Sequence, residues 1–458
     1  MIIHPTDNVE VREDGQKYAL STIKKGDSVI KYGFPIGYST QDIQPGEQVS
    51  PKNLHSALSG MGDWTYDPLP TSPMGIKTGS FLGYERKNGD VGIRNEIWVI
   101  PTVGCINDVA KSLADKGGAK ALTHPYGCSQ LGGDLETTRR ILAGLIKHPN
   151  AAGVLVLGLG CENNTMDGQI AALGDFDRER VRFLNIQDCN DEMEEGLAIL
   201  AELRALADND VRTPQPISKL RVAVKCGGSD GYSGITANPL VGRTMERFSE
   251  YGATVLMSEL PEVFGAEQLL LSRSKDKGVF DSTADMIRRF RQYFIDHGEG
   301  IADNPSPGNV KGGITTLEEK SLGCVQKAGK VMLCGALDFG EAPPSDGGLY
   351  LVNGPGNDMV AVTDLSASGA HMILFTTGRG TPLAGPVPTL KISTNTPLAA
   401  KKSHWIDLDA GVLLDGADMD ELADRLFSLC MTVAEGAEPK SEVAGYCDIA
   451  IFKDGVTL

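Results

Sequence analysis

The sequence predicts an α/β protein in which a small N-terminal β domain precedes two larger domains built on parallel sheets. Short strands separated by glycine turns fill the first 65 residues, a proline-rich stretch follows, and strand–helix units then alternate to the end. A chain of 458 residues exceeds the usual size of one domain, so two or three are expected. The expected divisions are a β domain (1–65), a linker (66–78), a middle α/β domain (79–218) and a C-terminal α/β domain (219–458).

Composition excludes several classes of protein. The net charge of −17 argues against nucleic acid or an anionic membrane as the main partner. No apolar run is long enough to cross a bilayer, and residues 1–5 lack a secretory pattern. Nine cysteines, an odd number, fit reduced thiols in a cytoplasmic protein better than a disulfide framework.

The N-terminal segment alternates short apolar stretches with turns. Strands are predicted at 18–23, 28–32 and 36–40, with turns at 24–27 and 44–47. The following linker contains three prolines within six residues, Pro68, Pro70 and Pro73, which favours a stiff, extended chain.

The middle and C-terminal segments repeat a strand–helix rhythm. The middle segment predicts strands at 96–103, 120–124 and 153–159 and helices at 136–147 and 192–206. The C-terminal segment predicts a helix at 239–248 and strands at 220–225, 253–257, 330–333 and 370–375.

Residues 226–238, between the strand at 220–225 and the helix at 239–248, are the strongest indication of a functional site. The glycines of this turn let the backbone approach a ligand, and the helix N-terminus offers free N–H donors to an anion. A structural turn would need few of the polar side chains that this segment carries: Cys226, Ser229, Asp230, Ser233, Thr236 and Asn238.

Cysteines recur just beyond predicted strands, the edge at which α/β proteins bind ligands. They are Cys105, Cys128, Cys161 and Cys226, and Cys324 also follows a glycine. Any one of them could simply pack as a small apolar residue, but five in such settings indicate that a subset binds iron or lines a site. No CxxC pair is present, so a zinc finger is not expected.

Two further strand ends carry candidate groups. Glu259 and Glu262 follow the strand at 253–257 and could bind a cation or act as acid and base, or else stabilise the start of a helix. Thr377 and Arg379, after the strand at 370–375, could hold a carboxylate. Two more residues, Lys391 and Asn395, could line the same pocket. The histidine within that strand, His371, is predicted to be a core residue.

The order of these motifs resembles the altronate/galactarate dehydratase family. The resemblance covers nearly the whole chain. Its motifs are 31–38, 88–96, 101–107, 126–133, 148–164, 226–239, 261–268, 304–327, 376–381 and 452–458. The long matches at 148–164 and 304–327 point to its altronate branch.

The resemblance implies a β-clip head of SAF type, a middle domain used in homodimer formation and a Rossmann-like catalytic domain. It also implies an iron-dependent hydro-lyase that dehydrates a sugar acid, D-altronate, to 2-dehydro-3-deoxy-D-gluconate. The residues expected to do this are Ser229, Asp230, Glu259 and Glu262 in catalysis, Ser233, Asn238, Thr377, Arg379, Lys391 and Asn395 in substrate binding, and Cys226, Cys128, Cys161 and Cys324 at the metal.

The head departs from the family pattern at two places. Gln16 stands where the family usually has a histidine, and Ser50-Pro51-Lys52-Asn53 replaces a His-x-His-Asn segment. Lys17, Lys52 and His55 are the candidates to replace those histidines.

Several alternatives stay open. The substrate could be another aldonate or an aldarate. The metal could be Fe²⁺, Mn²⁺ or a [4Fe–4S] cluster on three of the five strand-end cysteines. A non-catalytic sugar-acid-binding protein is the alternative from another class.

Overall fold

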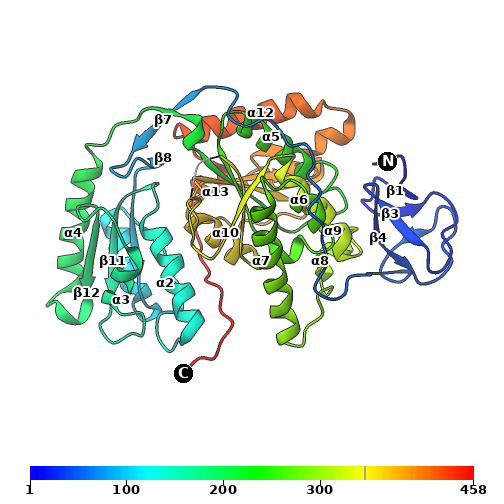
Figure 1. Ribbon diagram of the computed structural model, residues 1–458. Coiled ribbons are helices and arrows are strands. Elements are labelled where there is room, and N and C mark those ends of the chain that lie inside the picture. Colours follow the sequence, from blue (N-terminus) through cyan, green and yellow to red (C-terminus); the bar gives the residue numbers. More distant parts are fainter. Residues whose placement is uncertain (345–346) are drawn as a thin grey trace.

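The computed structural model describes residues 1–344 and 347–458. Three parts lie in a row: the blue N-terminal head at one end, the large C-terminal domain in the centre and the middle domain at the other end (Figure 1). Among the described residues, no helix combines the length and apolar character needed to span a bilayer.

The head consists of two small antiparallel sheets, with strand orders β1-β2-β5 and β3-β4-β6. Their strands are β1 (Val9–Val11), β2 (Lys17–Ala19), β3 (Ser28–Lys31), β4 (Phe34–Ser39), β5 (Gln48–Val49) and β6 (Leu54–His55). The predicted strand at 18–23 is too long, because the chain turns after Ala19 and Ile23 forms only an isolated bridge with Ile43. The buried side chains of Val29, Ile36 and Ile43 fill the space between the sheets.

The linker runs along the C-terminal domain as an extended segment without helix or strand. Main-chain hydrogen bonds hold it there, from Leu69 N to Ser272 O and from Gly75 N to Ser249 O. It leads into a three-stranded antiparallel sheet, which the sequence did not predict, of order β13-β7-β8. The strands are β7 (Ser80–Glu85), β8 (Val91–Gly92) and β13 (Thr213–Pro216).

The middle domain is a four-stranded parallel sheet of order β10-β9-β11-β12 with helices on both faces. Its strands are β9 (Glu96–Pro101), β10 (Lys120–Ala121), β11 (Ala151–Gly158) and β12 (Val181–Asn185), and its helices are η1 (Gly104–Ile106), α1 (Asn107–Gly117), α2 (Gly132–Ile146), α3 (Met166–Leu173), η2 (Ile186–Asp188) and α4 (Glu192–Ala207). Alternate residues along β9 and β11 enter separate cores on the two faces, as expected for strands buried on both sides. The strand β12 was missed, and β10 is shorter than predicted.

The C-terminal domain is built on a seven-stranded parallel sheet of order β16-β17-β15-β14-β18-β19-β20. Its strands are β14 (Arg221–Cys226), β15 (Thr254–Met257), β16 (Leu333–Leu337), β17 (Gly348–Val352), β18 (Met372–Thr377), β19 (Thr389–Ser393) and β20 (Leu408–Asp409). The prediction of a strand at 330–333 was wrong, since residues 330–332 lie outside any strand and β16 begins at Leu333. The strand predicted at 370–375 is confirmed as β18, and both of its ends lie two residues further along the chain.

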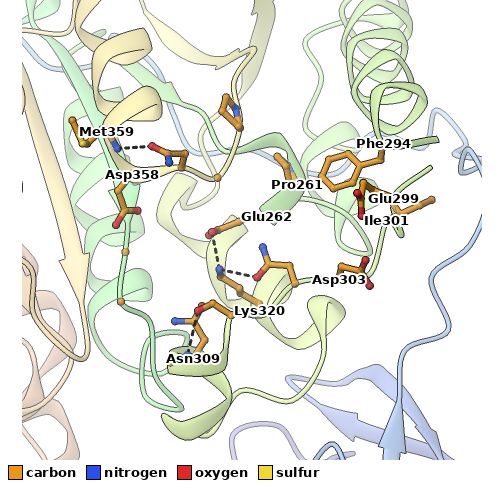
Figure 2. Close-up of a pocket in the computed structure, with 18 of the residues that line it drawn as sticks. Pro261, Glu262, Phe294, Glu299, Ile301, Asp303, Asn309, Lys320, Asp358 and Met359 are labelled. Carbon is orange, nitrogen blue, oxygen red and sulfur yellow. Dashed lines mark hydrogen bonds and ion pairs between the residues drawn. The ribbon is translucent and has the colours of Figure 1, made fainter. Parts of the chain in front are cut away.

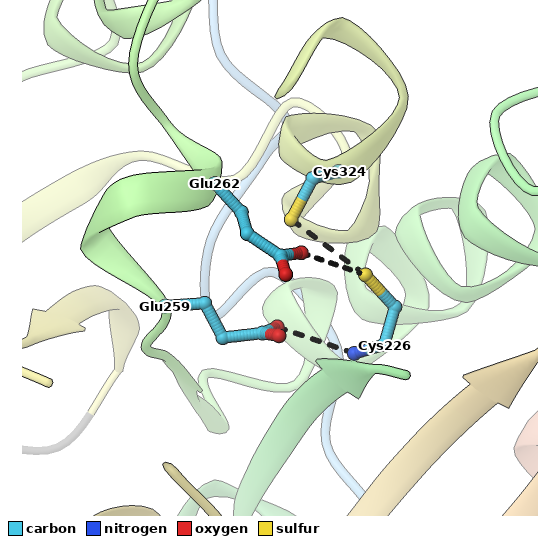
Figure 3. Close-up of side chains that lie close together, drawn as sticks. All are labelled: Cys226, Glu259, Glu262 and Cys324. Atoms are coloured by element: carbon cyan, nitrogen blue, oxygen red, sulfur yellow. Dashed lines mark hydrogen bonds between the residues drawn. The ribbon is translucent and has the colours of Figure 1, made fainter. Parts of the chain in front are cut away.

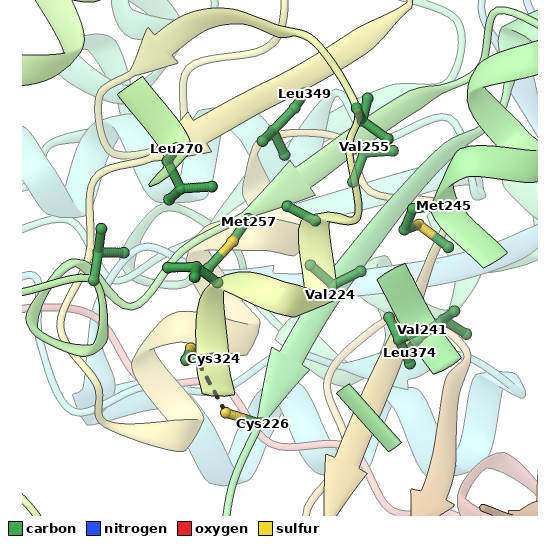
Figure 4. Close-up of a cluster of buried hydrophobic side chains, with 14 of the residues drawn as sticks. Val224, Cys226, Val241, Met245, Val255, Met257, Leu270, Cys324, Leu349 and Leu374 are labelled. Atoms are coloured by element: carbon green, nitrogen blue, oxygen red, sulfur yellow. Dashed lines mark hydrogen bonds between the residues drawn. The ribbon is translucent and has the colours of Figure 1, made fainter. Parts of the chain in front are cut away.

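Helices and single turns connect and cover this sheet. They are η3 (Ile217–Lys219), α5 (Ala237–Glu250), η4 (Leu260–Glu262), α6 (Glu267–Leu271), α7 (Lys277–Asp296), α8 (Pro307–Lys311), α9 (Leu317–Cys324), η5 (Val325–Ala328), α10 (Asp358–Ala367), α11 (Thr396–Lys401), η6 (Gly411–Asp415), α12 (Met419–Ala434) and α13 (Lys440–Val443). Apolar side chains of β14, β15, β17, β18 and α5 pack into a continuous core, and Cys226 and Cys324 lie at its edge (Figure 4). This core fixes the strand ends that carry the candidate site.

Candidate active site

Most of the predicted site residues converge at the carboxyl edge of the C-terminal sheet because the strands that precede them are neighbours. β14 ends at Cys226 and lies between β15 and β18. Glu259 and Glu262 follow β15, Arg379 follows β18, and Asn395 follows β19. The sequence placed these groups at separate strand ends, and the parallel register brings the strand ends together.

Asp230 anchors the glycine-rich loop after β14. It accepts hydrogen bonds from Thr394 Oγ1 (2.8 Å), Asn395 Nδ2 (3.0 Å) and Ser233 Oγ (3.1 Å). Burial raises the pKa of this carboxyl, and these hydrogen bonds oppose the shift. With its oxygens occupied in this way, Asp230 is placed to shape the loop.

Several predicted substrate-binding residues are also engaged within the protein. Asn238 donates to Gly323 O and accepts from Thr376 Oγ1. Thr377 Oγ1 accepts from Gly380 N, and Asn395 caps α11 through Leu398 N. Together with Ser233, these side chains join the loops of the sheet edge. Ser229 is buried and lines a gap of about 10 Å³ behind the loop.

Two cysteines and two glutamates form a buried cluster at the end of β14 (Figure 3). One ligand atom of each of Cys226, Glu259, Glu262 and Cys324 lies within 4.8 Å of the others. Cys226 Sγ is 3.8 Å from Cys324 Sγ and 3.4 Å from Glu262 Oε2. This donor set of thiols and carboxylates is chemically suited to iron.

A lysine ammonium lies among these four residues, in the place that a metal ion would take. Lys327 Nζ is 3.0 Å from Cys226 Sγ, 2.9 Å from Cys324 Sγ and 2.8 Å from Glu259 Oε2. The second Glu259 oxygen pairs with Lys225, which also contacts Asp358 at 2.8 Å. The cluster as arranged therefore does not fit a divalent metal, because lysine cations already balance its carboxylates.

The pKa values of the cluster agree with a dense, buried ionic network. Burial alone would lower the pKa of Lys327, but the Cys226 and Cys324 sulfurs and Glu259 raise it well above its usual value. Burial and the neighbouring Cys226 raise the pKa of the Cys324 thiol. Lys327 is thus held as an ammonium, and Cys324 as a thiol.

A cavity of about 1050 Å³ opens beside this cluster (Figure 2). Gly227, Gly228, Glu262, Lys320 and Arg379 are among the residues that line it. Lys320 Nζ lies 2.8 Å from Glu262 Oε1 and within 3.1 Å of Asn304 Oδ1. The volume of the cavity lies at the upper end of the range of small-molecule sites, which is ample for a six-carbon acid.

Arg379 and Lys391 differ sharply in position. Arg379 is exposed at the cavity and donates from one guanidinium nitrogen to Gly308 O (3.1 Å), which leaves other N–H groups for a ligand. Lys391 is buried within β19, with Nζ 3.5 Å from the centroid of the Phe375 ring. Burial lowers its pKa to about 7. Arg379 is therefore the better placed of the two to bind a carboxylate.

The head docks onto the same region through a buried ion triad. Glu319 of α9 pairs with Lys17 (2.9 Å) and Lys31 (2.8 Å) of the head, and the three side chains are at most 1% exposed. Burial alone would raise the pKa of Glu319, but the two lysines lower it to about 2. Tyr32 and Lys31 also close the gap behind the loop, next to Cys226 and Asp230.

The head residues at the two departures lie in different settings. Gln16 Nε2 donates to Lys311 O across the head–body interface, although at a long 3.4 Å. Lys17, beside it, is buried in the triad, whereas Lys52 and His55 are exposed on the head surface. Of the three candidates to replace the family's histidines, Lys17 contacts the body, through Glu319 and Gly313 O.

Sequence reasoning missed the lysines that organise the site. Lys320, Cys324 and Lys327 are spaced i, i+4, i+7, which places them on one side of α9 and the turn that follows. That spacing was a usable signal. Lys31 and Glu319 meet only because the head docks, and no local pattern could have paired them.

Cys128 and Cys161 do not join the cluster with Cys226 and Cys324. Both are exposed in loops of the middle domain, after β10 and β11. The structure therefore divides the four predicted metal ligands between two domains.

Comparison with known proteins agrees with this architecture. Family models match residues 6–57 (altronate/galactarate dehydratase SAF domain), 83–208 (D-galactarate dehydratase/altronate hydrolase, second domain) and 217–457 (D-galactarate/altronate dehydratase, C-terminal).

Curated relatives extend this match over nearly the whole chain. Altronate dehydratases of Bacillus subtilis strain 168 and Escherichia coli K12 are each 46% identical, over 98% of this chain and 94% of their own length. The L-threo-forming galactarate dehydratase of Escherichia coli K12 is 31% identical over 94% of this chain and 88% of its own. The chain belongs to the D-galactarate/altronate dehydratase family of hydro-lyases.

Proposed function

We propose that the protein dehydrates D-altronate to 2-dehydro-3-deoxy-D-gluconate. The observation that carries this proposal is the cavity in which an arginine faces a buried lysine–glutamate pair beside the glycine-rich loop. The preference for altronate over an aldarate rests on the relatives, since identity is 46% to altronate dehydratases and 31% to the galactarate dehydratase.

Dehydration of a 2,3-dihydroxy acid removes the proton at C2 and expels the C3 hydroxyl as water. The electron pair left at C2 is shared with the carboxylate as an enediolate, which needs cationic neighbours. The C2–C3 enol that results tautomerises to the 2-keto product. The site must therefore supply positive charge at the carboxylate and a base, and the base can return the C2 proton to the leaving hydroxyl as its acid.

Arg379 and Lys320 supply the positive charge. Arg379 presents a planar fork at the cavity, which can bind a carboxylate through two parallel hydrogen bonds. Lys320 lines the same cavity, and its pKa is raised, against the effect of burial, chiefly by Glu262. It therefore stays an ammonium and stabilises the charge that develops on the substrate's carboxylate.

Glu262 is the carboxylate best placed to take the proton from C2. Burial alone would raise its pKa, while Lys320 is the first of the cations that lower it. When Lys320 turns toward the substrate's carboxylate, Glu262 loses that partner and its affinity for a proton increases. Glu259 does not line the cavity and is saturated by Lys225 and Lys327, so we assign it to positioning Cys226.

The cofactor, the oligomer and the compartment remain predictions from the family resemblance and composition. We expect activity to need ferrous iron under reducing conditions, with Mn²⁺ or a [4Fe–4S] cluster as the alternatives. We also expect a cytoplasmic homodimer that uses neither nucleic acid nor membrane as a partner.

Arg379→Lys should weaken the use of altronate by roughly 10- to 100-fold in kcat/KM. Lysine cannot reproduce the two parallel hydrogen bonds, and a charged hydrogen bond contributes about 1.5–3 kcal/mol. Because Arg379 is exposed, the melting temperature should not change. The measurement is steady-state formation of the 2-keto-3-deoxy acid from a panel of C5 and C6 aldonates and aldarates.

Lys402→Arg is the matched control, because Lys402 lies on the same domain and does not line the cavity. An unchanged kcat/KM in folded Arg379→Lys protein would show that the substrate's carboxylate binds elsewhere, and Lys391 would be the next candidate. Absence of a 2-keto product from every acid in the panel would contradict the proposed activity itself.

A further inference from the structure

The middle domain gathers its cysteines at one edge of its sheet. It contains Cys105, Cys128, Cys161 and Cys189, and each follows one of the four parallel strands, β9, β10, β11 and β12. The carboxyl ends of parallel strands lie side by side, with neighbours about 4.8 Å apart. Cysteines scattered for packing would not all select this edge.

Three of these four cysteines differ from the fourth in exposure and in the residue that precedes them. Cys105, Cys128 and Cys161 are exposed free thiols, and each directly follows a glycine. Cys189 is half-buried, follows an aspartate and donates from Sγ to the carbonyls of Asn185 (3.4 Å) and Ile186 (3.2 Å). Cys189 is thus engaged by its own loop, whereas Cys128 Sγ and Cys161 Sγ each accept a long contact of 3.9 Å, from Ser129 Oγ and Gln187 Nε2 respectively.

Hydrogen bonds between the loops hold the three exposed cysteines near one another. Gly104 N, next to Cys105, donates to Tyr126 O (2.8 Å) in the loop of Cys128. Gly127 O, next to Cys128, accepts from Asn164 N (2.8 Å) in the loop of Cys161. Ser129 N adds a bond of 2.7 Å to Asn163 Oδ1.

The glycines before these cysteines are required for that approach. A Cβ atom on Gly104 would lie 2.8 Å from His124 O, and one on Gly127 would lie 2.0 Å from Thr102 O. Gly160 has φ +123° and a Cβ there would lie 2.7 Å from Gln187 Oε1. Each Gly-Cys pair therefore combines a close contact at the glycine with an exposed cysteine.

Positive charge lies close to the three cysteines. The helices α1, α2 and α3 begin shortly after Cys105, Cys128 and Cys161 respectively, so their positive N-terminal ends face this edge. Arg139 adds a guanidinium that donates to Asn163 O (3.0 Å) and Asn164 Oδ1 (3.1 Å). An anionic group held by three thiolates is compensated by these charges.

The three cysteines do not form a site for a single metal ion. A tetrahedral ion with bonds of about 2.3 Å needs sulfurs about 3.8 Å apart. Across the described chain, the group with ligand atoms within 4.8 Å of one another is the Cys226 group, and these three cysteines do not form another. In an iron–sulfur cluster each thiolate binds a different iron, which suits wider spacing.

We propose that Cys105, Cys128 and Cys161 bind a [4Fe–4S] cluster at the carboxyl edge of the middle-domain sheet. The cluster site is separate from the Cys226 group, where Lys327 lies among the ligands. One iron lacks a cysteine ligand. Residues 454–458 link this edge to the substrate cavity, because Asp454 pairs with His297 at the cavity rim (2.8 Å) and Leu458 N donates to Ser129 O (3.0 Å).

The test is anaerobic reconstitution of the full chain with ferrous iron, sulfide and dithiothreitol. We expect a brown protein with about four irons and four sulfides per chain, as the cluster formula requires. Cys105→Ser, Cys128→Ser and Cys161→Ser should each lose most of the bound sulfide and visible absorption. Cys189→Ser is the matched control on the same edge and should retain both, as should Cys226→Ser and Cys324→Ser.

Three results would overturn the proposal: a colourless wild-type protein, bound iron without sulfide, or loss of colour in Cys226→Ser with retention in Cys128→Ser. Circular dichroism melts of each variant show whether it is folded. If the single variants unfold, the exposed thiols of the wild-type protein are alkylated before reconstitution instead. A brown colour in the alkylated protein would contradict the proposal. These readouts do not depend on sugar-acid turnover, so they stand whether or not altronate is the substrate.

Discussion

Lys320→Met should lower kcat on altronate by roughly 10²–10³-fold, the usual cost of removing one group that stabilises charge in a transition state. Lys320 is the cation that both lines the cavity and pairs with Glu262, at 2.8 Å. Methionine keeps the length of the side chain but cannot stabilise the enediolate. The measurement is the single-turnover rate of 2-keto acid formation at saturating substrate.

A loss of activity could also come from Glu262, which becomes an unpaired buried carboxylate in this variant. The double variant Lys320→Met/Glu262→Gln removes both charges, so it should recover the melting temperature without recovering the rate. Lys320→Arg keeps the charge and should retain more activity than the methionine variant. A Lys320→Met protein with wild-type kcat would exclude Lys320 from the chemistry.

Glu319→Gln should release the head from the body and destabilise the protein by about 3–5 kcal/mol, the range for breaking a buried ion pair. The change leaves Lys17 and Lys31 buried without a counter-charge, since Glu319 faces both. Thermal unfolding and limited proteolysis of the linker report the two effects. Lys17→Met is the matched control and should be milder, because it leaves a balanced pair of Lys31 and Glu319.

The docking of the head onto the body should depend on pH through Glu319. Glu319 has a pKa of about 2 in the docked state, below the ordinary value of 4.5. Its contribution is therefore fully present above about pH 4.5 and is lost as the pH falls toward 2. Acid should loosen the head of the wild-type protein over that range, and the Glu319→Gln variant should lack this dependence. Equal acid sensitivity in both proteins would show that other groups control docking.

The sequence could predict the strands whose side chains are buried on both faces, and it failed where pairing decides the structure. β14 and β15 form continuous apolar runs and were predicted within a residue or two. β7 and β13 were missed, since they pair across 130 residues of chain and Pro214 and Pro216 weaken any strand signal. The 330–333 prediction was wrong because Val331 and Met332 lie in the loop before β16, where the buried Val331 packs against the core.

The sequence predicted which loops form the candidate site but not the roles of the residues within them. The loops after β14, β15 and β18 carried visible polar motifs, and they do meet. The roles within them depend on contacts between distant segments, such as the one between Lys327 and Cys226, 101 residues apart. Sequence alone grouped all the strand-end cysteines as one set, and only the fold separates the exposed ones of the middle domain from the buried pair.

The segment 58–64, just before the linker, tethers the head to its own body. It lies between Ala57, which contacts Glu318, and Thr65, which contacts Gln268, and Arg291 donates a hydrogen bond to Gly60 O within it (2.9 Å). Such a tether keeps the head at a high effective concentration, in the millimolar range for short linkers. Cleaving the chain there would turn a concentration-independent contact into a bimolecular one. The activity of the nicked enzyme should then fall on dilution, and the midpoint of that fall would measure the affinity of the head for the site that it closes.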